Sequence, residues 1–337
     1  MKFLELLACA AVGAGTLAGG ALAQESIGGS FAMPRDVVSA ATAFGRYMAG
    51  AARIDAGFAS GGAVAKSLEA AASYEPAQLE EGMIAYGAIA ALQDDRFVAG
   101  VERAAGRGED RAAFAERLIE DPFAATQIDG AEAAAQRIEA ALGAKAGPLI
   151  SAANQVKAAA YSVQHQAWSR AMVADAEARL AAVKRWSAAR AAPTDDDNEA
   201  MMSEVAGFDP FFAADGGPVG FTPIEARALA LAAEAVLGRA SGADRDRLSP
   251  LLSDADSAEC LKMAKLNLYQ CMAVAGPQYE DIYCLGQHAM LDTGECVGHA
   301  THEAGGESHV ITLSARGDAR ASAAPMVSHR ALRVDPD

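Results

Sequence analysis

The stretch CLKMAKLNLYQCMAVAGPQYEDIYCLGQHAMLDTGEC, residues 260–296, contains four of the five cysteines in this chain of 337 residues. Asp256 or Ser257 supplies a helix cap just before it, so we expect a helix from there to about Ala275. Gly276-Pro277 then predicts a turn, because neither residue readily continues a helix. The stretch therefore predicts two antiparallel helices, which together form a helical hairpin.

The spacing of the cysteines within this hairpin selects their pairing. Cys260 and Cys271 lie on one face of the first helix at roughly 16 Å, too far apart for a disulfide, whose Cα atoms lie within about 7 Å. Tyr279–Leu291 is predicted as the returning helix, which brings Cys284 level with Cys271 across the turn. Cys260 is then left to pair with Cys296, in the turn after the second helix. We predict two nested disulfides, 271–284 and 260–296.

The two cysteine pairs resemble the twin-cysteine helical hairpins of coiled-coil-helix-coiled-coil-helix proteins. The resemblance covers these 37 residues, and the ten and eleven residues between the cysteines on either side of the turn depart from that family's spacing. It implies a clamped hairpin and carries over no partner or pathway. A redox role is the alternative, but redox cysteines typically use a C-x-x-C spacing, which this stretch lacks. We therefore expect disulfides that stabilise the fold.

The first 23 residues predict the compartment. Lys2 precedes an apolar stretch of alanine, glycine and leucine that ends in Ala21-Leu22-Ala23, as in a secretory signal peptide cleaved before Gln24. Disulfides form in the oxidising compartments that exported proteins reach. We therefore predict a periplasmic or secreted protein.

Two other interpretations of this segment remain open. Phe3–Ala23 is about long enough for an uncleaved anchor helix, although glycines at positions 13, 15, 19 and 20 make it weakly hydrophobic. Leu6-Leu7-Ala8-Cys9 resembles a lipoprotein cleavage site, but almost no apolar sequence precedes it. Signal cleavage is the interpretation we carry forward, and it predicts no membrane span in the mature chain.

The composition favours helices and argues against several partners. The chain is 52% hydrophobic and only 6% aromatic, with many alanines, which predicts closely packed helices with few bulky core residues. With 28 basic and 44 acidic residues, its net charge of −16 would repel nucleic acid and anionic membrane surfaces. We predict an all-α fold: an alanine-rich helical bundle with a disulfide-clamped antiparallel helical hairpin near the C-terminus.

Apolar residues at three- and four-residue steps predict helices through most of the mature chain. The predicted bundle covers residues 24–191, with helices at 36–58, from Pro76 to about 101 with a break at Asp94-Asp95, at 109–120, at 130–143, and from Pro148 to about Ala191. Gly61-Gly62 is expected to end the first helix and Asp121-Pro122 the third.

A linker or long loop is predicted at 192–221, where proline, glycine and an acidic run interrupt the helical pattern. Thr222 and Glu225 then form a capping box, so we expect a helix from there to about Ala240. With the hairpin it makes up a second helical segment, residues 222–297. Residues 298–337 are predicted as a weakly structured tail, in which HVITLS at 309–314 could form one short strand.

Histidines near the end of the chain are the candidates for a metal site. His299 and His302 are three residues apart and could bind a metal together with Glu303 or His309. Glycines surround them and this spacing is common by chance, so we favour no metal site and predict no cofactor. His288 is expected on the hairpin surface or against the partner helix.

Aromatic residues gather in the predicted linker. They are Phe208, Phe211, Phe212 and Phe221. Such residues either fold back onto the helices, which we favour, or form a patch that binds a partner. The acidic run at 195–199 resembles part of a calcium loop, but Ala200 stands where that loop needs glycine, so we favour a solvated segment.

No catalytic motif selects a reaction. The chain lacks G-x-S-x-G, S-x-x-K and G-x-x-x-x-G-K sequences, and His165 has no obvious nucleophile as a partner. We therefore expect an exported, non-catalytic helical binding or structural protein of the cell envelope, whose partner is an unidentified protein or envelope component. The alternative is an envelope hydrolase acting on cell-wall glycan through a carboxylate pair, which the sequence does not locate.

Overall fold

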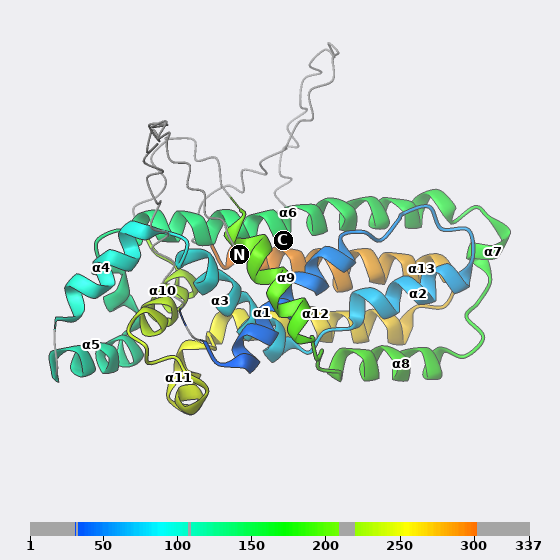
Figure 1. Cartoon of the computed structure of the whole chain (residues 1–337). Helices are drawn as coiled ribbons and strands as arrows, with labels where there is room; N and C mark the ends of the chain where they lie inside the picture. The colour runs from blue at the N-terminus through cyan, green and yellow to red at the C-terminus, as the bar shows by residue number, and fades with distance from the viewer. Residues whose placement is uncertain (1–30, 32, 107–108, 209–219, 302–337) are drawn as a thin grey trace, which may run out of the picture. The chain divides into compact units, whose positions relative to one another are not determined.

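Two helices that are buried on almost every side lie in the core of the fold, whose elements are labelled in Figure 1. The structure is a computed structural model that describes residues 31, 33–106, 109–208 and 220–301. Within it, α3 (Pro76–Ala91) and α10 (Pro223–Val236) bury nearly all of their residues and contact each other. A helix that is apolar all round belongs in a core, so the other helices pack around these two. The predicted signal peptide and the predicted strand at 309–314 lie outside the described residues.

The remaining helices are joined mostly by short connections. In the first half of the chain they are α1 (Arg35–Ala51), α2 (Gly61–Ala72), α4 (Asp95–Ala105), α5 (Glu109–Glu120), the 3-10 helix η1 (Pro122–Gln127) and α6 (Ala131–Val163). In the second half they are α7 (Ala167–Arg170), α8 (Ala176–Ala188), α9 (Asp195–Ala206), η2 (Gly242–Asp244), α11 (Arg245–Leu248), η3 (Ser249–Leu251), α12 (Ala255–Val274), α13 (Gln278–Cys284), the π-helix η4 (Leu285–Leu291) and α14 (Asp292–His299). The all-α prediction is confirmed for the described residues. No helix among them is long and apolar enough to cross a membrane.

Small residues determine how closely these helices approach. A Cβ atom on Gly82 of α3 would lie 2.2 Å from the carbonyl oxygen of Ala40 in α1, and one on Gly87 would lie 3.0 Å from the Ile138 side chain in α6. Any larger residue at Gly82 would force α1 and α3 apart, since side chains in protein cores leave almost no free space. The alanine- and glycine-rich composition thus produces a core in which helix backbones touch.

α1 ends earlier than the sequence pattern predicts. The helix expected over 36–58 stops at Ala51, and Gly61-Gly62, expected to end it, instead opens α2. Ser60 determines where α2 begins, because its side chain accepts a hydrogen bond from the backbone N–H of Ala63 and caps the new helix. The predicted break before α4 is confirmed, because Asp94 caps that helix in the same way.

α6 replaces two predicted helices and ends well before the predicted end of the second one. The helices expected at 130–143 and from Pro148 to about Ala191 are replaced by one helix that passes through Pro148 and stops at Val163. Proline removes the N–H that would bond the carbonyl of Ala144. Both Pro148 and Ala144 are exposed, so water can bond this carbonyl and the helix continues.

The chain leaves α6 through a capped end. Ser169 is buried and donates a hydrogen bond to the carbonyl oxygen of Val163. After α7, Met172 forms an isolated antiparallel bridge with Pro277 in the hairpin turn. α8 then begins at an Asp175 cap and packs on α12. The predicted helix is therefore wrong beyond Val163, because polar caps end one helix and start another.

The predicted linker at 192–221 contains a helix. α9 begins at a capping box in which Thr194 and Asp197 exchange hydrogen bonds. Its buried Asn198 accepts a hydrogen bond from the Thr42 hydroxyl at 2.7 Å, which docks α9 on α1. The acidic run at 195–199 forms the first turns of α9, where carboxylates interact favourably with the positive end of the helix dipole.

Both predicted disulfides are present in the hairpin. Cys260–Cys296 and Cys271–Cys284 link α12 to the returning helices, with Cα atoms 5.7 Å apart in each pair. The cap of α12 is Asp254, a few residues before the predicted positions. The pairing prediction is confirmed because the turn at 276–277 brings the two helices level as expected.

The returning helix continues past its predicted end because it packs directly on α6 (Figure 1). A Cβ on Gly286 would meet the backbone nitrogen of Lys157 at 2.6 Å, and one on Gly294 would meet the Ile150 side chain at 2.8 Å. The glycine in Asp292-Thr293-Gly294 therefore allows close helix contact and does not mark a turn. Cys296 accordingly lies within α14 and not in the predicted turn.

α10 starts at the predicted capping box and contains a carboxyl group with an unusual pKa. Thr222 Oγ1 accepts from the backbone N–H of Glu225, and the Glu225 carboxylate accepts from the backbone N–H of Thr222 at 2.8 Å. Burial raises the pKa of Glu225 to about 7; the negative charge of Glu139 adds to the rise, and the Thr222 hydrogen bonds partly oppose it. The helix ends at Val236, before the predicted residue 240, because Gly238 adopts a left-handed conformation with φ 69°.

Replacing Glu225 by glutamine should flatten the dependence of stability on pH. Between pH 4.5 and about 7 the folded chain holds a proton on Glu225 that the unfolded chain releases, so the free energy of unfolding falls as pH rises through this window. Glu225→Gln keeps an oxygen for the cap but cannot titrate. Urea unfolding from pH 4.5 to 8 should show that this fall becomes smaller by up to about 3 kcal/mol.

Two further measurements complete this test. Glu225→Ala removes the cap as well, so it should lower the free energy of unfolding by about 1 kcal/mol at pH 4.5, and like Glu225→Gln it should lack the Glu225-dependent fall at higher pH. Asp281, whose pKa burial raises to about 6, contributes a slope of its own in all three proteins. An unchanged pH profile in Glu225→Gln would show that Glu225 titrates normally in the fold.

Candidate functional site

A cavity of about 300 Å³ lies between α1, α2, the start of α3 and the segment that follows α8. We call it the tyrosine pocket; its lining includes Arg46, Tyr47, Tyr74, Glu75, Gln78 and Ala191. Alanine, leucine and proline side chains provide most of the remaining wall. Its lining is divided between polar and apolar surface, and a concave site with a few fixed polar groups is the usual form of a small-ligand site.

Two tyrosines in ring contact, tilted relative to each other, line this pocket. The rings of Tyr47 and Tyr74 lie 4.6 Å apart between centroids. The Tyr47 hydroxyl donates to the carbonyl oxygen of Ala71 at 3.0 Å or of Ala289 at 3.2 Å, and the Tyr74 hydroxyl bonds the Thr293 hydroxyl at 2.7 Å. Burial raises the pKa of both phenols above the ordinary value, so both stay protonated. The hydroxyls hold the rings in fixed positions.

A buried lysine, Lys265, contacts the ring of Tyr74. Lys265 Nζ lies 3.2 Å from the centroid of the Tyr74 ring and donates hydrogen bonds to the carbonyl oxygen of Ala72 at 2.7 Å and to Ser187 Oγ at 3.2 Å. Burial lowers the pKa of Lys265 well below its ordinary value of 10.5. Ala72 is the last residue of α2, where unpaired carbonyls favour a donor.

Lysine and serine in contact are also the residue types of a serine–lysine hydrolase. Ser187 is 2% exposed and Lys265 is 4% exposed, and neither lines the tyrosine pocket. A nucleophile needs contact with its substrate, so we assign both residues to the support of the pocket.

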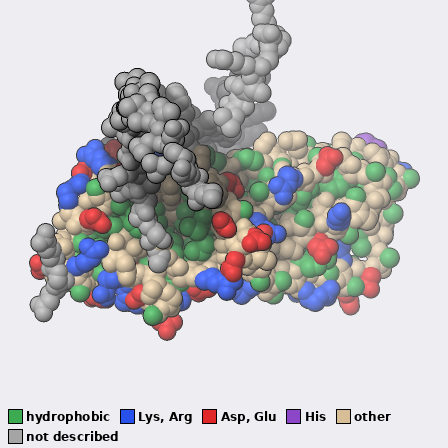
Figure 2. All heavy atoms as spheres, viewed as in Figure 1, with side chains coloured by type: hydrophobic (Ala, Val, Ile, Leu, Met, Phe, Trp, Pro, Cys, Tyr) green, Lys and Arg blue, Asp and Glu red, His purple; other side chains and the backbone are tan. Residues whose placement is uncertain are grey.

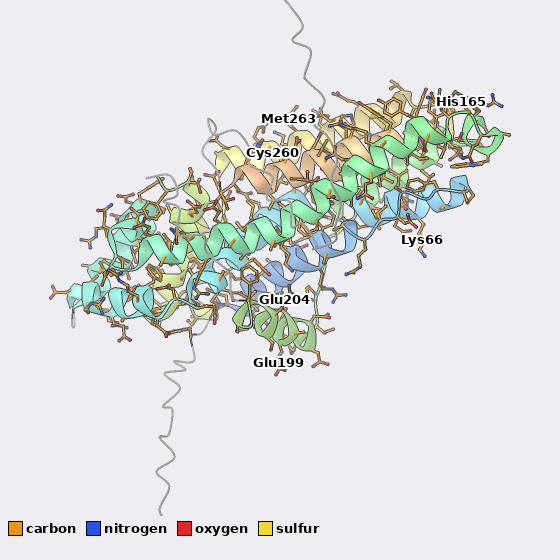
Figure 3. All side chains as sticks on the ribbon, turned by 90° about the horizontal axis from the view of Figure 1, so that it is seen from above. Lys66, His165, Glu199, Glu204, Cys260 and Met263 are labelled. Atoms are coloured by element: carbon orange, nitrogen blue, oxygen red, sulfur yellow. A yellow bond between two sulfur atoms is a disulfide. The ribbon has the colours of Figure 1, made fainter. Side chains whose placement is uncertain are left out.

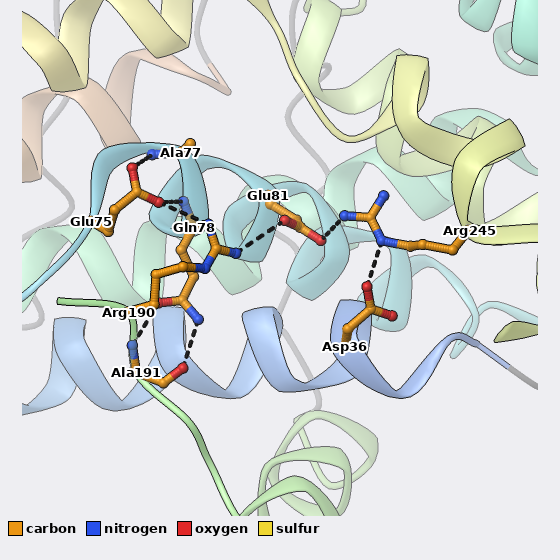
Figure 4. Close-up of polar contacts among 8 residues, drawn as sticks. All are labelled: Asp36, Glu75, Ala77, Gln78, Glu81, Arg190, Ala191 and Arg245. Carbon is orange, nitrogen blue, oxygen red and sulfur yellow. Dashed lines mark hydrogen bonds and ion pairs between the residues drawn. The ribbon is translucent and has the colours of Figure 1, made fainter. Parts of the chain in front are cut away.

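The wall opposite α2 is fixed by one glutamine side chain (Figure 4). Gln78 Nε2 donates to the carbonyl oxygen of Ala191 at 2.8 Å, and Gln78 Oε1 accepts from the backbone N–H of Ala191, also at 2.8 Å. The amide thus pairs with the backbone as a neighbouring strand would. Because Gln78 is buried and lies in the central helix α3, the extended segment at 191–193 is held at a fixed distance from the core.

A chain of alternating charges runs along α3 beside this wall (Figure 4). Arg190 bridges Glu75 at 3.0 Å and Glu81 at 3.7 Å, and Arg245 bridges Glu81 at 2.7 Å and Asp36 at 2.6 Å. Burial raises the pKa of Glu81, while the two arginines oppose that rise. The network joins α1, α3, α11 and the end of α8, so it orients the elements that shape the pocket.

Charged residues at the rim come from different helices. Glu75 caps α3 by accepting from the backbone N–H groups of Ala77 and Gln78. Arg46 of α1 pairs with Asp197 of α9. A ligand in the pocket would therefore meet both polar and apolar surface, with one charged group of each sign, Arg46 and Glu75, in the lining.

A second depression, of about 550 Å³, lies between α1, the end of α3 and α9. Val38, Ile89 and Met202 contribute apolar surface, and Asp195 pairs with Arg35 there. It is more open to solvent than the tyrosine pocket, so fewer of its contacts would surround a ligand.

The residues singled out from the sequence are not brought together in one site. The four paired cysteines staple the hairpin, and Cys260 is labelled beside Met263 on α12 in Figure 3. His299 ends α14 and is exposed, whereas His302 and His309 lie outside the described residues. Within the described ranges, no group of three or more histidine, cysteine, aspartate or glutamate residues is placed to hold a metal ion.

The aromatic residues of the predicted linker are described only in part. Phe208 and Phe221 are half-buried, and Phe211 and Phe212 lie outside the described residues. His165 is exposed in the turn after α6 and lies far from α9, whose Glu199 and Glu204 are labelled in Figure 3. Basic and acidic side chains are interspersed on the face shown in Figure 2.

Sequence reasoning missed the residues of the tyrosine pocket. Lys265 carried a usable signal, because Leu261, Leu268 and Met272 place it on the buried face of α12. Tyr47, by contrast, follows an ordinary apolar pattern. The chain matches no protein-family model, no curated protein and no solved structure when compared with each of these.

Removing the Gln78 amide should loosen the pocket wall. Gln78→Ala leaves the N–H and carbonyl of Ala191 without their partner, which should lower stability by about 1–3 kcal/mol. Hydrogen exchange at the Ala191 amide should become faster. The matched control is Gln93→Ala, since Gln93 bonds only the Ile89 carbonyl of its own helix. Equal exchange rates at residue 191 in both variants would contradict the proposed role of Gln78.

Replacing the buried lysine should abolish a pH effect on stability. The unfolded chain holds the Lys265 proton at pH values below 10.5 where the folded chain has released it, so the free energy of unfolding should rise with pH below 10.5. Lys265→Met should remove this rise, measured from pH 7 to 9.5, below the range in which tyrosines titrate. Lys262→Met on the exposed side of α12 should keep it; loss of the rise in that control would exclude Lys265 as its cause.

Proposed function

We propose that the protein is an exported, non-catalytic binding protein of the cell envelope, and that the tyrosine pocket holds its ligand. The observation that carries this proposal is the pairing of Gln78 with Ala191, which holds one wall of the cavity in a fixed position relative to α3. A wall held by hydrogen bonds from a central helix favours a preformed site, and preformed sites lose less entropy on binding.

The pocket favours a small ligand with an apolar or aromatic body and a polar end. The apolar body would lie against Tyr47 and the alanine side chains, and the polar end would lie near Arg46 and Glu75. A cavity of about 300 Å³ is at the lower limit for such sites.

Export is part of the same proposal. The two disulfides support it, because such bonds persist in oxidising compartments and are rare in the cytosol of most organisms. The predicted signal peptide at residues 1–23 supports it from the sequence. Periplasmic or extracellular location would be read from fractionation, with the N-terminus determined by mass spectrometry.

Binding in the pocket can be tested with an anilinonaphthalene sulfonate dye, which has an aromatic body and one anionic group. Ala70 of α2 is exposed and lines the pocket, so Ala70→Phe should fill the cavity with little effect on folding. Ala65→Phe on the same helix is the matched control, since Ala65 is exposed and lies outside the pocket. In a fluorescence titration, the affinity for the dye should fall by about tenfold in Ala70→Phe and stay unchanged in Ala65→Phe.

The two variants separate the pocket from other surfaces. Equal dye binding by wild type and Ala70→Phe would reject the pocket as the site. Native mass spectrometry of protein recovered from the envelope then asks whether wild type, and not Ala70→Phe, carries a co-purified small molecule. Hydrolysis of cell-wall material by wild type would reject the non-catalytic part of the proposal.

One observation favours the alternative, an envelope hydrolase that acts on cell-wall glycan. Glu225, with a pKa raised to about 7 and the charge of Glu139 nearby, has the proton affinity of a general acid. Glu225→Gln keeps the helix cap and should abolish turnover if this alternative holds. We rank it second because Glu225 is 4% exposed and its carboxylate already serves the capping box.

A further inference from the structure

A polar cluster on the hairpin, separate from the tyrosine pocket, is organised around Asp292. Its carboxylate bonds Gln287 Nε2 at 2.9 Å and His288 Nδ1 at 2.8 Å, and Asn267 Nδ2 lies 3.4 Å away. These bonds lower the pKa of Asp292 below its ordinary value, although burial alone would raise it. Asp292 stays ionised and holds both neighbouring side chains in place.

The π-helix η4 is what aligns this cluster. The wider turn of a π-helix brings residues five apart onto one face, whereas an α-helix would turn them well away from each other. Gln287 meets Asp292 across this spacing, and the rings of Tyr283 and His288, also five apart, lie 6.4 Å from each other in an edge-to-face arrangement. π-helical turns occur frequently at functional sites.

α6 adds a cation to the cluster. Close contact at Gly286 brings α6 against η4, and Lys157 Nζ donates to Gln287 Oε1 at 3.0 Å. Among the described residues, no carboxylate pairs with Lys157. Lys157 is half-buried and bonds an amide and not a carboxylate, so its positive charge can attract an anionic ligand in a chain with a net charge of −16.

Histidine and tyrosine complete the surface. Because His288 directs Nδ1 to a carboxylate, that nitrogen carries the proton in the neutral ring and Nε2 remains an acceptor. Tyr161 of α6 is 59% exposed, and its ring lies 6.3 Å from Tyr283 in an edge-to-face arrangement. The cluster therefore presents one ammonium donor, one imidazole acceptor and an exposed aromatic ring.

We propose that Lys157, Tyr161 and His288 bind a saccharide that carries a carboxylate. Lys157 pairs with the carboxylate, Nε2 of His288 accepts a sugar hydroxyl, and the Tyr161 ring packs on the apolar face of the sugar. Gln287 and Asp292 position the first two groups. The disulfides at Cys284, directly before η4, and at Cys296 hold the π-helix in this form.

The test uses trigalacturonate as the probe and maltotriose as its neutral counterpart, titrated into the full mature chain by calorimetry. Trigalacturonate should bind, more weakly at higher salt, and maltotriose should bind at least about tenfold more weakly. Lys157→Gln and Tyr161→Ala should each weaken trigalacturonate binding by about tenfold. Lys184→Gln is the matched control, because Lys184 is an exposed lysine beside a tyrosine ring, that of Tyr269, and lies outside this cluster.

Each result bears on the proposal. Equal affinities for the two sugars, or equal losses in Lys157→Gln and Lys184→Gln, would overturn it, as would no binding of trigalacturonate. Thermal unfolding of each variant checks the fold, and Tyr161→Phe provides a milder change if Tyr161→Ala unfolds: it should keep most of the affinity. Ala70→Phe in the tyrosine pocket should leave trigalacturonate binding unchanged, so failure at one site is distinguishable from failure at the other.

Discussion

Backbone contact between helices is the constraint on which the rest of this structure depends. At Gly82, α1 and α3 are so close that a single added methyl group would overlap a carbonyl oxygen. Gly286 and Gly294 impose the same contact between α6 and the returning helix of the hairpin. Because few large side chains separate the helices, cohesion comes from many short contacts, and the position of each helix end becomes important.

Several polar side chains accordingly satisfy the backbone groups at helix ends. Lys265 donates to the last carbonyl of α2, Glu75 caps α3, and Thr222 with Glu225 caps α10. Each group satisfies backbone atoms that would otherwise be buried without a partner. The tyrosine pocket lies where the end of α2 and the start of α3 meet the middle of α1, so its polar lining follows from the caps of the helices around it.

The sequence predicted those features that depend on local chemistry. The capping box at Thr222 and the disulfide pairing follow from residues close to each other in the chain or related by one turn. It failed where tertiary contacts decide: Pro148 is tolerated because its face of α6 is exposed, and Gly294 continues a helix because α6 lies against it. The tyrosine pocket could not be predicted for the same reason, since Gln78 and Ala191 are 113 residues apart.

The returning helix of the hairpin explains why four cysteines are concentrated in one stretch. Asp292 and Thr293 are adjacent, yet Asp292 organises the outer cluster with His288, while Thr293 turns inward to bond the Tyr74 hydroxyl beneath the tyrosine pocket. A slip of the helix by one residue would misplace both contacts at once. The disulfides flank this pair, with Cys284 before the π-helix and Cys296 within α14, so they fix the register of both contacts. Covalent links are suited to this role because a π-helical turn is less stable than the α-helical turn it replaces, and the chain could otherwise relax into the wrong register.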